Sequence, residues 1–146
     1  MSNKSVSASF FEIYGNQHDV DGCRPLFTED AVVHYNGFGG PLNFEGYKQV
    51  GIAYLAGIPD MTTTVVDQVE EGSKVVSRVV WTGTHTSEFN GIPPTGRSFR
   101  IEDITIDHIV DNQIRERWVV GDLLGMMQQL GVVPAPQAAW RQKTEI

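Results

Sequence analysis

An aspartate lies between a strand-like segment and a helix-like segment near the end of the chain. In ERWVVGDLLGMMQQLG, residues 116–131, the first half is rich in β-branched and aromatic residues, and the second half has apolar residues at helical spacing. Asp122 stands between the two halves, where its carboxylate can accept hydrogen bonds from the first amides of a helix. A capping carboxylate is held ionised, whereas a carboxylate in a buried, apolar surrounding keeps its proton more tightly and suits acid/base catalysis. Spacing alone leaves both roles open for Asp122.

Three histidines lie in strand-like segments and could act together with that carboxylate. His108 alternates with Ile104 and Ile106 in ITIDHIV, so it is expected on an apolar strand face, either as a core residue or as a catalytic one. His85 precedes a long loop, so it could line the mouth of a pocket or lie on the surface at a strand end. His34 belongs to a short strand, on which it could face inward or outward. The three are dispersed, without the HxH or HExxH spacing of metal ligands, and no metal site is expected.

Other candidates for a pocket are aromatic or amide side chains. Trp81 and Trp118 most simply belong to the core, but aromatic residues along a concave face also suit a flat, apolar ligand. Tyr14 lies on the apolar stripe of the first predicted helix, and Asn36 follows the first strand, where it most simply supports a turn. Cys23 is the one cysteine, so it cannot form an internal disulfide, and we expect it to be buried in a protein of the reducing cytoplasm.

The apolar periodicity predicts helices first and strands afterwards. Helices are expected at residues 6–17, 19–27 and 44–58, with a short strand at 31–35. Four strands are expected at 62–70, 74–86, 99–110 and 113–120, before a last helix at 122–130 that Gly131 caps. This order predicts an α+β fold, in which a curved antiparallel sheet and N-terminal helices enclose an apolar pocket.

The register of the last predicted hairpin decides which side chains meet. A two-residue loop at 111–112 would pair His108 with Arg115 and would point Trp118 away from the face of His108. A bulge would shift the pairing by one residue and turn Trp118 onto that face. The sequence leaves both registers open. Strand alternation places three polar residues on the opposite, wetter face: Asp103, Thr105 and Asp107.

Length and charge narrow the class of protein. A chain of 146 residues fits a single domain at 1–146, with a core at about 6–131 and an extended C-terminal tail at 132–146. The net charge of -7 and the scattered basic residues argue against a nucleic-acid partner. The chain shows neither an apolar signal segment nor a stretch long enough to span a membrane, so we expect a cytoplasmic protein without a membrane partner.

Four stretches of the chain together resemble the SnoaL-like polyketide cyclase family of the nuclear transport factor 2-like superfamily. They are FTEDAVVHYNG, GIPDMTTTVVD, GSKVVSRVVWTGTHTSEFNGIPPTGRSF and NQIRERWVVGDLLGMMQQLG. The resemblance covers roughly residues 8–131, and Trp118 followed four positions later by Asp122 is its most diagnostic part. It implies a cone-shaped α+β barrel with the pocket inside, and a homodimer or homotetramer formed through the outer side of the sheet.

The resemblance also implies a reaction and its catalytic residues. The family's characterised cyclases close the last ring of an aromatic polyketide methyl ester by intramolecular aldol condensation, without a metal or an organic cofactor. Asp122 then looks like the catalytic acid/base, and His108 would orient it or donate to the developing enolate oxygen. Ile106 stands where these cyclases have a glutamine, two residues before the histidine. Contacts with a small apolar or aromatic substrate are expected from Tyr14, His34, Asn36, Trp81, His85, Ile106 and Trp118.

Two further functions fit the same predicted pocket. A hydrolase, dehydratase or isomerase of a small apolar molecule would need polar groups that hold water, for which His34, Asn36 and His85 are the candidates. A non-catalytic domain that binds a small apolar ligand would need Asp122 only as a helix cap. The fold alone does not decide between them, because one fold can host many functions.

Overall fold

The computed structural model describes residues 1–136, so the part of the predicted tail at 137–146 lies outside the described residues. Helices and strands follow the predicted order. They are α1 (Asn3–Phe10), the π-helical turn η1 (Phe11–Asn16), the 3₁₀ helix η2 (Asp21–Leu26), β1 (Phe27–Tyr35), α2 (Phe44–Gly57), β2 (Thr62–Glu71), β3 (Lys74–Thr84), β4 (Ser98–Val110), β5 (Gln113–Val120) and α3 (Leu123–Gln129). None of the helices in the described part is long and apolar enough to cross a membrane.

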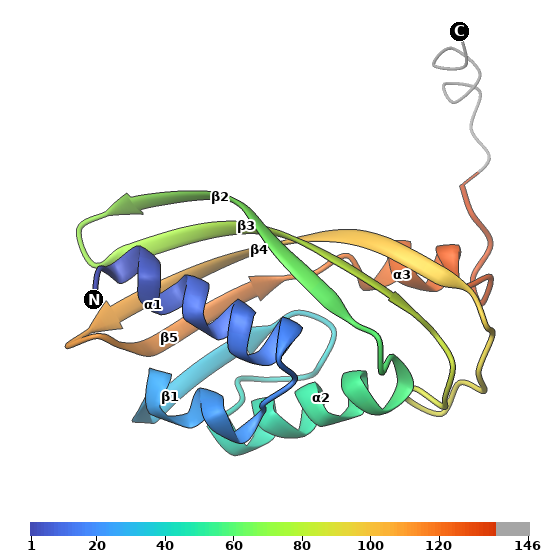
Figure 1. The fold of residues 1–146 in the computed structure, drawn as a ribbon, viewed down its shortest axis with the longest axis horizontal. Helices are drawn as coiled ribbons and strands as arrows, with labels where there is room; N and C mark the ends of the chain where they lie inside the picture. The colour runs from blue at the N-terminus through green and yellow to red at the C-terminus, as the bar shows by residue number, and fades with distance from the viewer. Residues whose placement is uncertain (137–146) are drawn as a thin grey trace, which may run out of the picture.

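The five strands form one curved sheet that stays open between its edge strands β1 and β2 (Figure 1). Their order across the sheet is β1-β5-β4-β3-β2. Strands β2 to β5 pair antiparallel with their neighbours, as the sequence predicts, whereas β1 pairs with β5 in parallel. Helix α1 crosses one face of the sheet, and α2 runs beside β1 on the same side of the molecule (Figure 1). The helices and the inner face of the sheet therefore enclose the interior.

The first helix changes its winding where it reaches the interior. A single α-helix is expected at 6–17, but the segment after Phe10 is π-helical, and the Gln17 N–H donates to the Glu12 carbonyl at 3.0 Å. The wider turn brings Gly15 so close to the sheet that a Cβ atom there would lie 3.1 Å from the Trp81 ring. Short π-helical segments of this kind occur often at functional sites.

The hairpin between β4 and β5 contains both a two-residue turn and a bulge. Asp111 and Asn112 have φ angles of 50° and 62°, which are the left-handed values that a type I′ turn requires. The pairing then shifts between His108 and Ile109, so Arg115 is the extra residue and Trp118 lies opposite Ile106. Of the two registers that the sequence leaves open, the structure has the bulged one.

Charge explains why the bulged register is preferred. Without the bulge, Asp107 would lie directly opposite Glu116, and like charges across a strand pair are destabilising. With the bulge, Asp107 lies opposite Arg117. The extra residue therefore replaces a repulsive pair with an attractive one.

The predicted faces of β4 are wrong. Asp103, Thr105 and Asp107 point inward and are only 6%, 2% and 0% exposed, whereas Ile104 and Ile106 point outward and are 47% and 37% exposed. The inner face of β4 is apolar only at the two ends of the strand, at Phe99, Ile101 and Ile109. Its middle is polar because it faces the ion pair and the cavity described below, and this inverts the local hydrophobic pattern.

A fully buried ion pair joins β4 to β5 and to α1. Nε and Nη2 of Arg117 donate to Oδ1 and Oδ2 of Asp107 at 2.6 and 2.8 Å. The Ser7 hydroxyl donates to Oδ2 of Asp107 at 2.8 Å, and the guanidinium lies 4.0 Å from the centre of the Phe10 ring. A buried carboxylate and a buried guanidinium need these hydrogen bonds, because each charged group is otherwise costly to remove from water.

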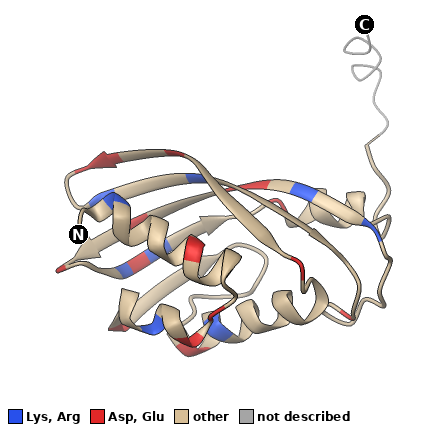
Figure 2. Cartoon of the chain, in the orientation of Figure 1, with Lys and Arg blue, Asp and Glu red and all other residues tan. Residues whose placement is uncertain are grey.

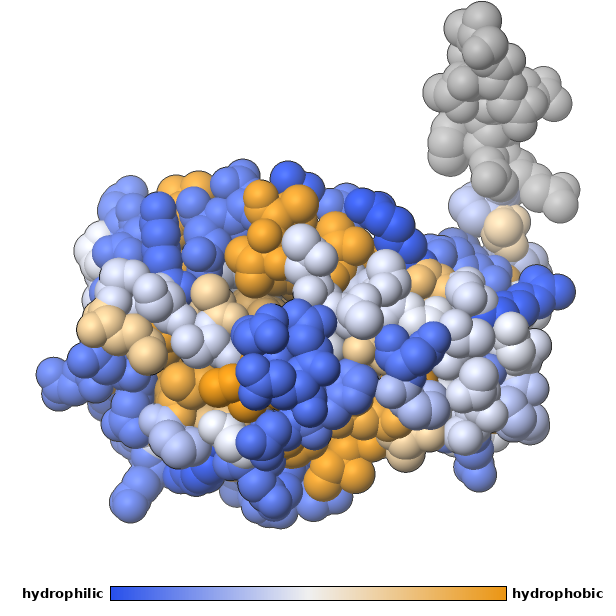
Figure 3. All heavy atoms as spheres, in the orientation of Figure 1, coloured by the Kyte–Doolittle hydropathy of each residue, from blue (hydrophilic) through white to orange (hydrophobic). Residues whose placement is uncertain are grey.

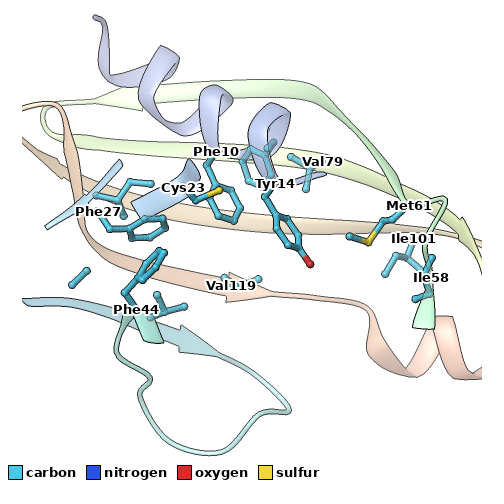
Figure 4. Close-up of a cluster of buried hydrophobic side chains, with 14 of the residues drawn as sticks. Phe10, Tyr14, Cys23, Phe27, Phe44, Ile58, Met61, Val79, Ile101 and Val119 are labelled. Carbon is cyan, nitrogen blue, oxygen red and sulfur yellow. The ribbon is translucent and has the colours of Figure 1, made fainter. Parts of the chain in front are cut away.

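Aromatic side chains fill the space around this ion pair. Figure 4 shows Phe27 and Phe44 facing each other, with their ring centroids 5.1 Å apart. Cys23 lies in the same cluster and is 2% exposed, which confirms its predicted burial. Burial raises the pKa of its thiol to about 12, an effect that Arg117 partly opposes. Cys23 is therefore a core residue and not a nucleophile at neutral pH.

The charged groups on the surface are dispersed. Figure 2 shows that Lys and Arg positions are scattered along the chain among Asp and Glu positions. In the same view, Figure 3 shows a mostly hydrophilic face with hydrophobic groups over the middle of β2 and along α2. Such separated apolar groups are ordinary for a folded protein surface.

We expect Arg117→Met to lower the free energy of unfolding by about 3–5 kcal/mol, because it leaves the Asp107 carboxylate buried and unpaired. Urea unfolding followed by circular dichroism measures this loss. The matched control is Arg78→Met, which breaks an ion pair between exposed residues, Arg78 Nη1 to Glu102 Oε1 at 2.7 Å. That change should cost less than about 1 kcal/mol. Equal losses in the two variants would contradict a dominant role for the buried pair.

Candidate active site

A cavity lies between the N-terminal helices, α2 and the inner face of the sheet. Its lining is mainly aromatic, with aliphatic side chains between the rings. Figure 4 shows the Tyr14 ring directed from η1 into the space between this helix and the sheet. The aromatic members of the lining are Phe10, Phe11, Tyr14, Tyr35, Phe44, Tyr47, Tyr54, Trp81 and Phe99. Such a lining suits a flat, largely apolar ligand, and its few polar groups must then fix the orientation of that ligand.

Asp103 is the carboxylate in this lining. It is 6% exposed, and its Oδ1 accepts a hydrogen bond from the Asp122 N–H at 3.3 Å. Gly121 leaves room for the carboxylate, because a Cβ at that position would lie 3.2 Å from Oδ2. Burial raises the pKa of Asp103 to about 6; the hydrogen bond from the Asp122 amide opposes this shift, and the Asp122 charge adds to it. Asp103 can therefore exchange a proton near neutral pH.

Asp122 caps the last helix, as one of its two predicted roles requires. Its Oδ1 accepts a hydrogen bond from the Gly125 N–H at 2.9 Å, and its side chain is exposed and outside the cavity lining. Asn36 supports the same joint, because its Oδ1 accepts from the Gly121 N–H at 2.9 Å. Asp122 thus affects the cavity only indirectly: its backbone amide and its negative charge both act on Asp103.

The tyrosine hydroxyls of the lining are engaged with the protein. Tyr14 donates to the Gly51 carbonyl at 2.9 Å, Tyr35 donates to the Tyr54 hydroxyl at 3.5 Å, and Tyr47 accepts from Arg117 at 3.3 Å. Burial raises the pKa of Tyr14 and Tyr35, so both stay protonated at neutral pH. Asp103 is consequently the group of the lining that is suited to proton transfer.

Four of the predicted site residues lie on the outer face of the sheet, away from the cavity. They are His34, Ile106, His108 and Trp118. His34 Nε2 lies 2.7 Å from Glu116 Oε2, and its ring stacks on Trp118 with centroids 5.4 Å apart. The structure therefore does not bring His108 beside Asp122 in the cavity, because His108 lies on the same outer face of β4 as Ile104 and Ile106.

Of the remaining predicted site residues, His85 lies beside a loop, and Tyr14 and Trp81 lie in the cavity. His85 is fully buried but is not part of the lining; its Nδ1 accepts from the Thr95 N–H at 3.2 Å and so holds the loop between β3 and β4. Tyr14 and Trp81 line the cavity. Among residues 1–136, no three His, Cys, Asp or Glu side chains gather in an arrangement that could hold a metal ion.

Sequence reasoning missed Asp103 and Thr105, although a signal for them was present. Alternation followed over the whole of β4 puts both residues on the face of Phe99, Ile101 and Ile109. The central ITIDHIV segment alone favours the opposite face. The strand ends, together with charge pairing in the hairpin, would have selected the observed face.

The fold is an α+β fold of the nuclear transport factor 2-like type, because helices cover one face of a curved, open sheet. Between them lies an aromatic cavity with a buried carboxylate, as is typical of an enzyme. The sequence profile of the SnoaL-like polyketide cyclase family matches residues 5–130. The chain therefore belongs to this family, and it is a cyclase-type enzyme.

Relatives and solved structures agree with this membership. The chain is 35% identical over 128 residues to the nogalonic acid methyl ester cyclase of Streptomyces nogalater, covering 87% of this chain and 94% of the relative. It is 37% identical over 131 residues to the aklanonic acid methyl ester cyclase AcmA of Streptomyces galilaeus, covering 88% of each. The crystal structure of IdmH from Streptomyces antibioticus matches with a TM-score of 0.81 at 35% identity, over 90% of this chain and 99% of that one.

The raised pKa of Asp103 makes a prediction about stability. Asp103→Asn should raise the free energy of unfolding at pH 7.5 by up to about 3 kcal/mol, because the native state no longer buries a charge. The folded-state pKa of about 6 lies above the ordinary value of 3.8, so the folded chain binds the proton more tightly and its stability falls as the pH rises between these values. The gain should therefore shrink as the pH falls toward 4. Denaturant titrations at several pH values measure it.

The matched control for this prediction is Glu102→Gln, one position along β4 on the outer face, where the side chain is 48% exposed. It should change the free energy of unfolding by less than about 1 kcal/mol. A loss of stability in Asp103→Asn at pH 7.5 would show that the Asp103 charge is not costly in the native state.

Proposed function

We propose that this protein catalyses an intramolecular aldol ring closure of an aromatic polyketide methyl ester, with Asp103 as the acid/base. The single observation that supports this most is a buried carboxylate with a pKa of about 6 in an otherwise aromatic cavity. The relatives are named as cyclases of nogalonic and aklanonic acid methyl esters, which gives the class of substrate.

The proposed chemistry matches what one carboxylate can do. An aldol closure needs a base that removes a proton next to a carbonyl group, and an acid that protonates the resulting alkoxide. Asp103 takes the first proton and returns it in the second step, so the reaction conserves protons and electrons and requires neither a metal nor an organic cofactor. The aromatic walls hold the two carbons in contact, and this positioning supplies much of the rate.

Asp122 acts on Asp103 in this proposal. Its negative charge raises the pKa of Asp103, and its amide holds one carboxylate oxygen at 3.3 Å. The sequence-based proposal places catalysis on Asp122 and His108 themselves. The positions of the side chains favour Asp103, since Asp122 is an exposed cap and His108 lies on the outer face.

The alternative of a hydrolase or dehydratase has less support. The polar groups expected to hold water in it are His34, Asn36 and His85, and none of them belongs to the cavity lining. A non-catalytic binding domain remains the competing function, and it has a distinct outcome in the experiment below.

The experiment compares wild type, Asp103→Asn and Asp122→Asn in ring closure of nogalonic and aklanonic acid methyl esters, followed by chromatography. We expect Asp103→Asn to lower kcat about 100-fold or more, because it removes the group that carries the proton. Asp122→Asn should retain most of the rate. Its acidic limb should move to lower pH, since a like charge that raises the pKa of Asp103 is lost.

The outcomes separate the candidates. A large loss in Asp122→Asn with little loss in Asp103→Asn would return the catalytic role to Asp122. Binding without turnover in the wild type would identify a non-catalytic binding domain.

We further propose that the outer face of the sheet binds a second copy of this chain. Strand pairing aligns apolar side chains across this face, Val69 with Val76, Val76 with Ile106, and Ile106 with Trp118. We call these four residues the outer apolar row. Val69 is 59% exposed, and beside the row Val120 is 65% exposed. A continuous apolar surface of this kind is typical of protein interfaces.

Light scattering coupled to gel filtration tests this assembly. The wild type should have at least twice the monomer mass, and the mass distinguishes a homodimer from a homotetramer. Ile106→Lys should reduce it to the monomer, because a charge in the row would be buried at the interface. Ile52→Lys is the matched control, since Ile52 is 41% exposed on α2, in the helical layer. A monomeric wild type, or an unchanged mass in Ile106→Lys, would contradict the proposal.

A further inference from the structure

Two residues of the cavity lining each carry a buried polar atom that has no hydrogen-bond partner within the described residues. They are Nε1 of Trp81 and Oγ1 of Thr105. The other two such atoms, in Thr28 and His85, belong to side chains outside the lining. A buried polar atom without a partner is costly and calls for an explanation, and a polar group of a bound ligand provides one.

Both residues lie next to Asp103 on the inner face of the sheet. Thr105 is two positions along β4 from Asp103, which corresponds to about 7 Å between Cα atoms. Trp81 lies on β3 opposite Ile101, two positions from Asp103 in the other direction. Asp103 therefore occupies the middle of a polar series that runs Trp81, Asp103, Thr105.

The Trp81 ring is held in place by its neighbours. It packs edge-to-face against Phe11 and Tyr14, with centroids 6.1 and 5.9 Å away. The absence of a side chain at Gly15 lets η1 approach the ring closely. An N–H group fixed in this way needs little reorganisation to bind an oxygen atom, and this is the property that makes a donor effective for a developing negative charge.

We propose that Trp81 and Thr105 bind two oxygen atoms of the substrate, one on each side of the carbon that Asp103 deprotonates. This inference rests on the proposed function. Asp103 removes the proton from carbon, and the C–H electron pair forms an enolate whose oxygen accepts a hydrogen bond from Trp81 Nε1–H. The enolate carbon then attacks the second carbonyl, and a C–C bond forms.

The second oxygen becomes an alkoxide and takes the proton back from Asp103. Thr105 suits this position because its hydroxyl can donate to the carbonyl and the alkoxide and can accept from the product hydroxyl, whereas an indole N–H only donates. The substrate class is therefore an aromatic polycycle with oxygen functions on both sides of an acidic C–H group. Trp81 and Thr105 select for those two oxygens.

The test uses Trp81→Phe and Thr105→Val. Trp81→Phe keeps an aromatic side chain but loses the N–H together with the smaller ring of the indole, and Thr105→Val keeps the side-chain shape and loses the hydroxyl. Each should lower kcat about 10- to 100-fold in ring closure. The melting temperature should stay the same or rise in Thr105→Val, whereas in Trp81→Phe it should fall, because the smaller ring leaves space beside Phe11 and Tyr14. Thr82→Val on the outer face of β3 is the matched control and should keep the wild-type rate. Wild-type rates in both Trp81→Phe and Thr105→Val would overturn the inference.

A binding experiment separates this inference from the proposed reaction. The methyl ester of an anthraquinone carboxylic acid is titrated into ¹⁵N-labelled protein, and the indole N–H resonance that is absent from Trp81→Phe is followed. We expect that resonance to shift downfield, and Trp81→Phe and Thr105→Val to bind the ester about tenfold more weakly. If no ester is turned over but this shift and the weaker binding are found, the proposed reaction fails and the oxygen-binding role stands. An unshifted resonance, unchanged affinities or no binding by the wild type would overturn that role.

Discussion

The buried pair of Asp107 and Arg117 constrains more of this structure than any other contact. It requires the two residues to face each other, and the bulge at Arg115 is what places them so. The same register sends Val119 into the cavity and Trp118 to the outer face. Through Ser7 and Tyr47 the pair also fixes α1 and α2 against the sheet. Folding to any other register would leave a charge buried without a partner.

One strand carries two inward carboxylates with opposite properties. Asp107 is saturated by a guanidinium and a hydroxyl, so its charge belongs to the architecture. Asp103 has one long hydrogen bond from an amide and a like charge nearby, so its charge is poorly compensated and its proton is exchangeable. The difference arises from the opposite strand: Asp107 meets an arginine there, whereas the neighbour of Asp103 is a glycine. One position thus holds a fixed charge, and the other holds a proton that can be exchanged near neutral pH.

Much of the fold follows from the sequence, because helical spacing, strand alternation and turn residues act locally. The segments 113–120 and 44–58 are examples, and the Asp111-Asn112 turn has the left-handed conformation that its residues favour. The sequence does not predict which face of β4 points inward. Ile104 and Ile106 lie on the outer surface, whereas Asp103 and Thr105 point toward the cavity. Local hydrophobicity cannot distinguish a core from an exposed apolar surface. The structure therefore places the predicted Ile106, His108 and Trp118 on the outer side of the hairpin of β4 and β5, and the predicted Tyr14 and Trp81 in the lining of the cavity.

The open edge between β1 and β2 has a consequence for how this protein can change over evolution. A closed barrel has a diameter set by its number of strands and their stagger. An unclosed sheet has no such fixed diameter, so the width of the cavity depends on the helices that cover it. At Gly51 the approach is so close that a Cβ would lie 2.9 Å from the Tyr14 ring. Substitutions on η1 and α2 can thus change the size of the cavity without any change in β4, the strand that bears Asp103.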